Sequence, residues 1–230
     1  MDNNLPSLVV AFVLDESGSM ARATNQTVMG VNQYVQNLKE QNKENKVLFS
    51  LTKFSDKVTV LHTAEYIEDI PGIDGRYNPN GSTALFDAVG ETITETAKRV
   101  SDGTPVLVVV MTDGQENASI KYSHAAIKSL IEEKKAKNWS FVFLGEGEDK
   151  WIKEYGNSLG ISSCMSYSSD KMKCADDVKM QRVMRAASAG TKCYTDSLDK
   201  GLCADDRSKV FSAAFDMDCN LEDTKNPEIK

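Results

Sequence analysis

Oxygen-bearing side chains at alternate positions follow an apolar stretch near the beginning of the sequence. Asp15, Ser17 and Ser19 come directly after the apolar residues 8–14. Carboxylate and hydroxyl oxygens are hard donors, which suit Mg²⁺, Mn²⁺ or Ca²⁺ better than zinc. An Asp-x-Ser-x-Ser pattern alone is weak evidence, because it is expected by chance in on the order of one chain in twenty. Further ligands of a cation site must therefore come from elsewhere in the chain.

Two apolar segments, residues 8–14 and 105–111, are rich in valine and each leads to an aspartate. Such runs are typical of strands buried on both faces of a parallel sheet. Open α/β sheets bind their ligands at the carboxyl ends of the strands, where Asp15 and Asp113 are expected. Thr83 follows a loop rich in glycine and proline and is predicted to begin a helix. We expect these three positions to converge.

The remaining periodicity predicts alternating strands and helices, which indicate a doubly wound sheet. Two short strands are separated only by Ser55 and Asp56, a spacing that predicts a tight antiparallel hairpin at a sheet edge. Gly190 is predicted to end the last helix of the domain. The predicted helices are 28–39, 83–100, 125–136, 151–159 and 176–189, and the predicted strands are 8–14, 47–54, 57–61, 105–111, 139–144 and 163–167.

Three motifs occur in order: Asp-x-Ser-x-Ser at 15–19, Gly-Ser-Thr-Ala-Leu at 81–85 and Met-Thr-Asp-Gly at 111–114. Together they resemble the von Willebrand factor A domain with its metal-ion-dependent adhesion site, over roughly residues 7–190. The resemblance implies a three-layer, Rossmann-like α/β fold. Its sheet would be doubly wound, mostly parallel and six-stranded, with one antiparallel edge strand.

The resemblance also implies a ligand set for Mg²⁺, with Mn²⁺ or Ca²⁺ as alternatives: Asp15, Ser17, Ser19, Thr83 and Asp113. One coordination position would stay open for an acidic residue of a partner protein. Two carboxylates only neutralise a divalent ion, so a third carboxylate is still attracted. We expect the rim of this site to include Met20, Arg76, Tyr77, Gln115 and Glu116. Arg76 and Tyr77 are residue types enriched at binding hot spots, although loop composition alone would also explain them.

A metal-dependent protein-binding module is accordingly the expected function. Members of the resembled family include intracellular adaptors for larger machines such as AAA-type ATPases, and some are phage-encoded. The residues select none of these settings, nor an oligomeric state. With 27 basic and 34 acidic residues, a net charge of −7 and a pI near 5.0, binding to nucleic acid or to anionic membranes is not expected.

Length and composition predict a cytoplasmic protein. With 230 residues, 40% of them hydrophobic, the chain is long enough for one large domain. No apolar run approaches the roughly 20 residues of a membrane span, and no secretory leader is evident. Five cysteines at wide spacings favour reduced thiols over a disulfide framework.

Enzymatic alternatives lack most of their parts. Aspartate-based phosphohydrolases carry a second aspartate where this chain has Ser17, and no phosphate-binding loop or nucleophile elbow occurs. The two histidines, His62 and His124, are expected to be structural or solvated. A metal-activated water with Glu16 or Glu116 as general base stays open, as does a structural or assembly protein with an idle site.

A domain over residues 1–190 is predicted, followed by an extension over 191–230 that carries a partial repeat. Residues 164–177 and 193–206 share Cys, Ser, Asp, Lys, Cys, Ala, Asp and Asp, by duplication or by chance. The four cysteines of the repeat raise the alternative of zinc, at a spacing unlike that of zinc knuckles. A short helix with Phe211 and Phe215 either packs on the domain or faces a partner.

Overall fold

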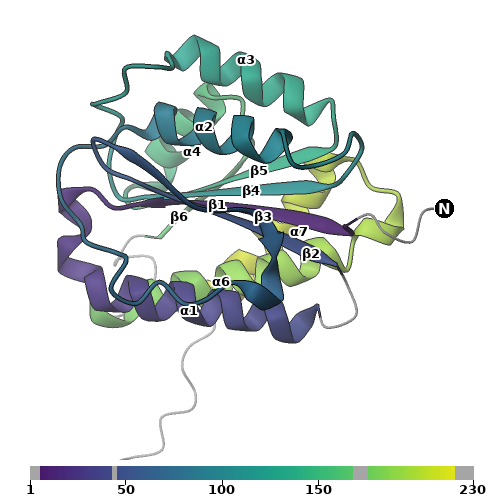
Figure 1. Ribbon diagram of the computed structural model, residues 1–230, viewed down its shortest axis with the longest axis horizontal. Helices are drawn as coiled ribbons and strands as arrows, with labels where there is room; N and C mark the ends of the chain where they lie inside the picture. Colours follow the sequence, from purple (N-terminus) through teal and green to yellow (C-terminus); the bar gives the residue numbers. More distant parts are fainter. Residues whose placement is uncertain (1–5, 43–45, 168–175, 221–230) are drawn as a thin grey trace, which may run out of the picture.

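A computed structural model describes residues 6–42, 46–167 and 176–220. Within these ranges the sheet has six strands in the order β3-β2-β1-β4-β5-β6, and only β3 is antiparallel to its neighbour. This arrangement confirms the predicted fold class (Figure 1). The strands are β1 (Leu8–Asp15), β2 (Val47–Phe54), β3 (Val58–Tyr66), β4 (Val106–Thr112), β5 (Trp139–Gly145) and β6 (Ser163–Ser166).

Helices cover both faces of the sheet (Figure 1). One face packs against α2 (Leu85–Ala97), α3 (His124–Lys135) and α4 (Asp149–Ser158). The other face packs against α1 (Thr24–Gln41), α6 (Asp176–Thr195) and α7 (Ala204–Asn220). Three short 3-10 helices complete the described elements: η1 (Gly18–Ala23), η2 (Ile67–Asp69) and η3 (Leu198–Lys200).

The central strand β1 explains why its sequence is apolar at every position. Alternate side chains of a strand point to opposite faces. Val10 and Phe12 lie in the core beneath α1 and α6, whereas Val9 and Ala11 lie in the core beneath α2. The register of β1 with β4 pairs Leu14 with Met111, so the residues after these two strands meet at the same edge.

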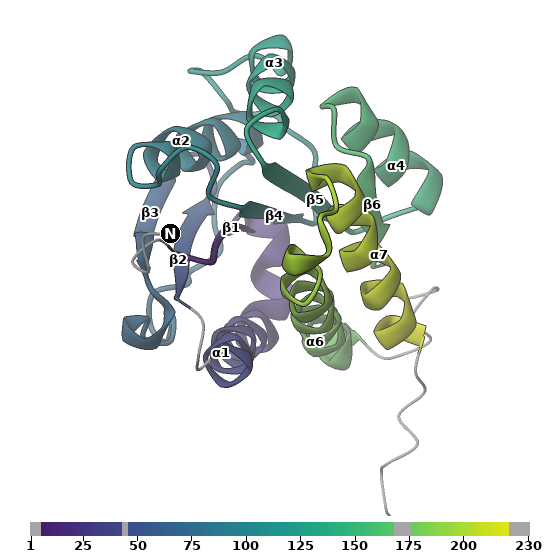
Figure 2. The same cartoon turned by 90° about the vertical axis from the view of Figure 1, so that its right-hand side faces the viewer.

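The described residues after 190, up to 220, pack on the same hydrophobic core as the residues before that predicted boundary. α6 continues through Gly190 to Thr195, and α7 lies beside α6 along β5 and β6 (Figure 2). A Cβ atom at Gly190 would lie 2.9 Å from Cγ of Phe211, so glycine permits close packing here and does not end the helix. Phe211 and Phe215 are fully buried, so the predicted apolar helix packs on the domain.

The described cysteines do not gather. Cys164 lies in the core beneath α4, whereas Cys193 is on α6, on the opposite face of the sheet. A zinc ion bound by all four cysteines of the repeat is therefore incompatible with the fold. Cys174 and most of the first repeat copy lie outside the described residues, so the repeat stays a sequence observation.

The bounds of β3 and α2 also differ from the predictions. β3 extends to Tyr66, five residues beyond its predicted end, with register shifts against β2 that interrupt the regular alternation. α2 begins at Leu85, which leaves Thr83 in the preceding loop. In the described ranges, no helix combines the length and the apolar character that crossing a membrane requires.

Candidate metal centre

Asp15 is the last residue of β1, and its carboxylate is buried beneath the edge of the sheet. Oδ1 accepts a hydrogen bond from the backbone N–H of Ser17 at 2.6 Å, and Oδ2 accepts one from the hydroxyl of Thr112 at 2.5 Å. Burial raises the pKa of Asp15, and the charge of Asp113 adds to this effect, although the hydrogen bonds oppose it. The carboxylate is therefore costly to ionise in this position unless a cation compensates it.

The two serines connect β1 to β4. Ser17 precedes η1 and Ser19 lies within it, and their hydroxyl oxygens are 3.1 Å apart. The Ser19 hydroxyl donates a hydrogen bond to Oδ1 of Asp113 at 2.6 Å. The turn after β1 thus places two hydroxyl oxygens between the two aspartates.

Asp113 carries an unsatisfied buried oxygen. Its side chain is 1% exposed, and Oδ2 has no hydrogen-bond partner within the described ranges. Burial raises the pKa of Asp113 and the nearby Glu146 adds to the rise, while Ser19 and Arg22 lower it. A buried carboxylate oxygen without a hydrogen bond is unusual and calls for a compensating ion or water. This feature fits a cation ligand.

Thr83 reaches the same place from the opposite side. A Cβ atom built on Gly114 would lie 3.3 Å from the Thr83 hydroxyl oxygen and 4.0 Å from that of Ser19. The absent side chain of Gly114 therefore keeps open a space that both hydroxyls border. Asn117 fixes Thr83, because its Oδ1 accepts from the Thr83 N–H at 2.8 Å and its N–H donates to the Thr83 carbonyl at 3.0 Å.

All five predicted ligand residues meet at the carboxyl edge of the sheet. The donor set consists of two carboxylates and three hydroxyls, which fits Mg²⁺, Mn²⁺ or Ca²⁺. In the described part of the chain, no group of three or more His, Cys, Asp or Glu side chains is placed to hold a metal. The hydroxyls must therefore contribute to any cation bound here, and the ligand roles stay a prediction.

Comparison with protein families identifies this architecture. The model of the von Willebrand factor type A domain matches residues 10–178, which is most of the chain. The chain belongs to this family. In related proteins the von Willebrand factor type A domain is a protein-interaction module, and domains of this family often bind divalent metals. No curated protein sequence matches the chain.

Solved structures share the fold at low sequence identity. The minor pilin PilB from Streptococcus sanguinis is 12% identical with a TM-score of 0.58, covering 85% of this chain and 63% of that one. The pilus adhesin SpaC from Lactobacillus rhamnosus GG is 12% identical with a TM-score of 0.59, covering 82% and 30%. Proximal thread matrix protein 1 from the mussel byssus is 19% identical with a TM-score of 0.54, covering 94% and 47%. This chain thus spans less than two thirds of each of these structures.

Two predicted rim residues of this von Willebrand factor type A domain are buried. Met20 is 1% exposed and belongs to the hydrophobic core. Tyr77 is 6% exposed, and its hydroxyl donates to the backbone carbonyl of Asp15 at 2.7 Å. The prediction of both as partner contacts is wrong, because loop composition does not reveal which side chains turn inward. Tyr77 instead holds the backbone of Asp15 in place from within the core.

Two other predicted rim residues are engaged within the domain. The Arg76 guanidinium donates to the Gly72 carbonyl at 2.7 Å and lies against His62 of β3, so it points to the sheet edge. The Glu116 carboxylate accepts hydrogen bonds from the backbone N–H groups of Phe86, Ala118 and Ser119 and from the Ser119 hydroxyl. Glu116 therefore holds its loop against the start of α2. Gln115 is the predicted rim residue that is exposed.

Sequence reasoning missed a charged network beside the candidate metal centre. Glu146 follows β5, and its carboxylate accepts from Arg22 at 2.9 Å and from Lys179 at 2.5 Å. Arg22 also lies 3.7 Å from Oδ2 of Asp113. The signal available in the sequence was the position of Glu146 after a strand, which repeats that of Asp113. Its cationic partners, Arg22 and Lys179, lie far from Glu146 in the sequence, and no local pattern indicated these contacts.

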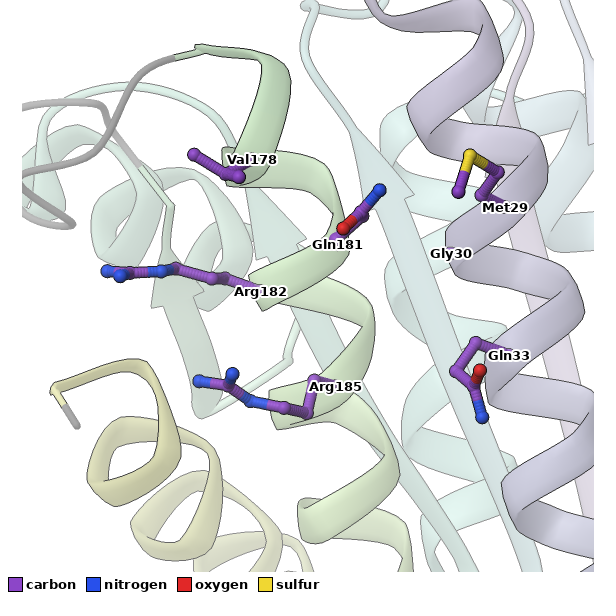
Figure 3. Close-up of a pocket in the computed structure, with 7 residues that line it drawn as sticks. All are labelled: Met29, Gly30, Gln33, Val178, Gln181, Arg182 and Arg185. Atoms are coloured by element: carbon purple, nitrogen blue, oxygen red, sulfur yellow. The ribbon is translucent and has the colours of Figure 1, made fainter. Parts of the chain in front are cut away.

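Two hollows at the surface lie at different distances from the candidate metal centre. A hollow of about 370 Å³ opens directly beside Asp113, between Gln115, Glu146, Glu148 and Trp151. A second hollow of about 340 Å³ lies in the groove between α1 and α6. There, Met29 and Gln33 of α1 lie across the groove from Gln181 of α6 (Figure 3). Of these two hollows, the one beside Asp113 is lined by a predicted metal ligand.

Proposed function

We propose that this domain binds a partner protein through a divalent cation at the carboxyl edge of its sheet, with a partner carboxylate completing the coordination. The observation that carries the proposal is the convergence of Asp15, Ser17, Ser19, Thr83 and Asp113, with a buried oxygen of Asp113 left without a hydrogen bond. When bound, a divalent cation supplies a coordination position for an anionic ligand.

The charges of the donor set favour an anionic partner group. Asp15 and Asp113 together neutralise a divalent cation, and the three hydroxyls add coordination without charge. A further carboxylate is therefore attracted to the same position. Burial of the two aspartates reduces screening by solvent and strengthens the attraction. These properties support recognition of an aspartate or glutamate side chain of the partner.

The surroundings of the centre offer access for such a group. Ser19 is exposed, and the hollow beside Asp113 is large enough to admit a side chain. Trp151 on one wall is half-buried, which suits a residue type common at binding hot spots. Gln115 and Glu148 are exposed on the same hollow and supply polar contacts at its rim.

We propose no catalytic role for the centre. The two acidic residues considered as general bases have carboxylates that hold the fold together. Oε1 of Glu16 accepts from the Lys53 ammonium at 2.8 Å and from the backbone N–H of Asn78 at 2.5 Å. Glu116 accepts four hydrogen bonds from its own loop and from α2. Neither is arranged like a free base that awaits a proton.

The test is retention of partners from a lysate by immobilised protein, with Mg²⁺ and with EDTA. Thr83→Ala removes one hydroxyl of the donor set and leaves the carboxylates in place. Thr59→Ala removes a hydroxyl from the exposed part of β3 and is the matched control. Met29→Ala alters the groove between α1 and α6 and tests the competing surface.

We expect wild type, Thr59→Ala and Met29→Ala to retain the same protein in Mg²⁺ only, and Thr83→Ala to lose most of it. Loss of retention in a partner variant whose acidic residue is replaced by its amide would identify the recognised carboxylate. Equal retention in EDTA would contradict the proposal and fit an idle site. If only Met29→Ala lost retention of the partner, the groove between α1 and α6 would be the binding surface.

A further inference from the structure

The cation site has a third carboxylate close by. Glu146 continues β5 just as Asp113 continues β4, and its backbone N–H donates to the carbonyl of Thr112 at 3.1 Å. This hydrogen bond holds the loop after β5 against the end of β4. Three neighbouring strands, β1, β4 and β5, therefore each deliver one acidic side chain to the same edge of the sheet.

Two cationic side chains meet this group of carboxylates, and they differ in position. The Lys179 ammonium is 2.5 Å from Oε1 of Glu146, and its side chain is 5% exposed. The Arg22 guanidinium is 2.9 Å from Oε2 of Glu146 and 3.7 Å from Oδ2 of Asp113, and its side chain is 58% exposed. Arg22 thus contacts both a predicted metal ligand and the third carboxylate, whereas Lys179 contacts Glu146.

Arg22 approaches the one oxygen of Asp113 that has no hydrogen bond in the described part of the chain. It also lies on η1, the short helix that carries Ser19. A permanent positive charge is thereby fixed next to the predicted ligands by the same element that supplies one of them. Its effect on a cation is repulsive, and the effect of Glu146 is attractive.

We propose that Arg22 and Glu146 set the affinity of the site for divalent cations, with Arg22 lowering it and Glu146 raising it. The inference rests on the proposed function, because it requires that a cation binds at Asp15 and Asp113. Arg22 and Glu146 act as charged neighbours that tune the ligands and not as ligands themselves. Because the two charges act in opposite directions, loss of either one alone would shift the affinity for the cation.

A purely structural role for Arg22 predicts the opposite sign. If the ion pair with Glu146 served only to hold η1 in place, its loss would loosen Ser19 and weaken cation binding. Electrostatic tuning predicts tighter binding after the positive charge is removed. A unit charge about 8 Å from a divalent cation, in a water-like dielectric, changes affinity by about fivefold. The change shrinks as salt screens the exposed guanidinium.

The experiment is calorimetric titration of the full chain with MnCl₂ alone, at low and at high NaCl concentration. Arg22→Gln is expected to bind Mn²⁺ about fivefold more tightly than wild type, and Glu146→Gln about fivefold more weakly. Arg22→Lys keeps the charge and is expected to stay within about twofold of wild type. Lys192→Gln removes a charge from an exposed pair with Asp196, about 20 Å along α6 from Lys179, and is the matched control.

The outcomes separate this inference from the proposed function. Unchanged or weaker Mn²⁺ binding by Arg22→Gln, with wild type binding normally, would overturn the inference and leave the metal centre intact. No Mn²⁺ binding by wild type would overturn the metal centre itself. A gain by Lys192→Gln equal to that by Arg22→Gln would reduce the effect to net charge and contradict the specific pairing. Thermal unfolding of each variant in MnCl₂ gives an independent readout, because tighter binding raises Tm further.

Discussion

Two groups of buried polar side chains at opposite ends of the sheet differ in how their hydrogen bonds are satisfied. At the amino end of β5, Arg207 is buried and donates to the Leu202 carbonyl at 2.6 Å and to Oδ1 of Asn138. The hydroxyls of Ser140 and Tyr194 beside it are 2.9 Å apart. At the carboxyl end, Asp113 keeps a buried oxygen without a hydrogen bond in the described structure.

The difference separates polar groups that are satisfied within the fold from a buried carboxylate oxygen that is not. Hydrogen bonds made within the chain contribute to stability, and leaving a buried group unpaired costs about 1–3 kcal/mol. The Arg207 cluster therefore fixes α7 on the sheet. Burial raises the pKa values of the two aspartates of the candidate metal centre, which means that their ionised forms weaken the fold.

The largest effect is expected from removing an anchor of α7. Phe211→Ala would leave a cavity between α7 and Gly190 of α6 and is expected to lower the free energy of unfolding by about 3–5 kcal/mol, measured by urea denaturation. Met217→Ala, on the exposed side of the same helix, is the control and should change it by less than about 0.5 kcal/mol. A small effect of Phe211→Ala would show that α7 is not part of the core.

A smaller loss in the free energy of unfolding is expected from removing Arg207 from its hydrogen-bonded cluster at the amino end of β5. Arg207→Ala leaves the Leu202 carbonyl and the Asn138 side chain without their donor, and should cost about 2–3 kcal/mol by the same measurement. Lys209→Ala removes a cation from an exposed pair on α7 and should be nearly neutral. Neutrality of both variants would erase the contrast between the two ends of the sheet.

The smallest effect should have the opposite sign. Asp15→Asn removes a buried charge and is expected to stabilise the protein by about 1 kcal/mol at neutral pH without added metal, while abolishing cation binding. Because the folded-state pKa of Asp15 is raised, wild type recovers its deficit as the pH falls through that pKa. The advantage of Asp15→Asn should therefore shrink on acidification and vanish below the ordinary value of 3.8.

That trend is measured by urea denaturation of both proteins at neutral and at acidic pH. Asn42→Asp, at another buried position on the α1 side, would introduce a charge instead of removing one and should destabilise the fold. If Asp15→Asn proved less stable than wild type at neutral pH, the carboxylate would be serving the fold and not a ligand.

Local patterns predicted the doubly wound fold and the convergence of Asp15, Thr83 and Asp113, whereas the full set of five candidate ligands came from the resemblance to the family. Valine-rich strands with both faces buried, and aspartates directly after two of them, required only strand geometry and the parallel arrangement. The direction of loop side chains was not predictable, because burial of Met20 and Tyr77 depends on packing between distant segments. The contact of Arg22 with Glu146 joins residues 124 positions apart, and no local spacing encodes it.

Gly190 shows the same limit within a helix. Glycine often follows the end of a helix, and that preference predicted a helix end and a domain boundary at this position. The structure uses the missing side chain for the approach of Phe211 from α7, a reason that is visible only after α7 is placed. Local sequence rules favoured a helix end at Gly190, whereas tertiary packing required a residue without a side chain inside the helix.

The most direct test of the metal centre is anomalous diffraction from crystals of the full chain soaked in MnCl₂. One strong peak enclosed by Asp15, Ser17, Ser19, Thr83 and Asp113, and absent in Asp15→Asn crystals, is the predicted result. No peak at this edge of the sheet, or a peak that persists in Asp15→Asn, would contradict the account.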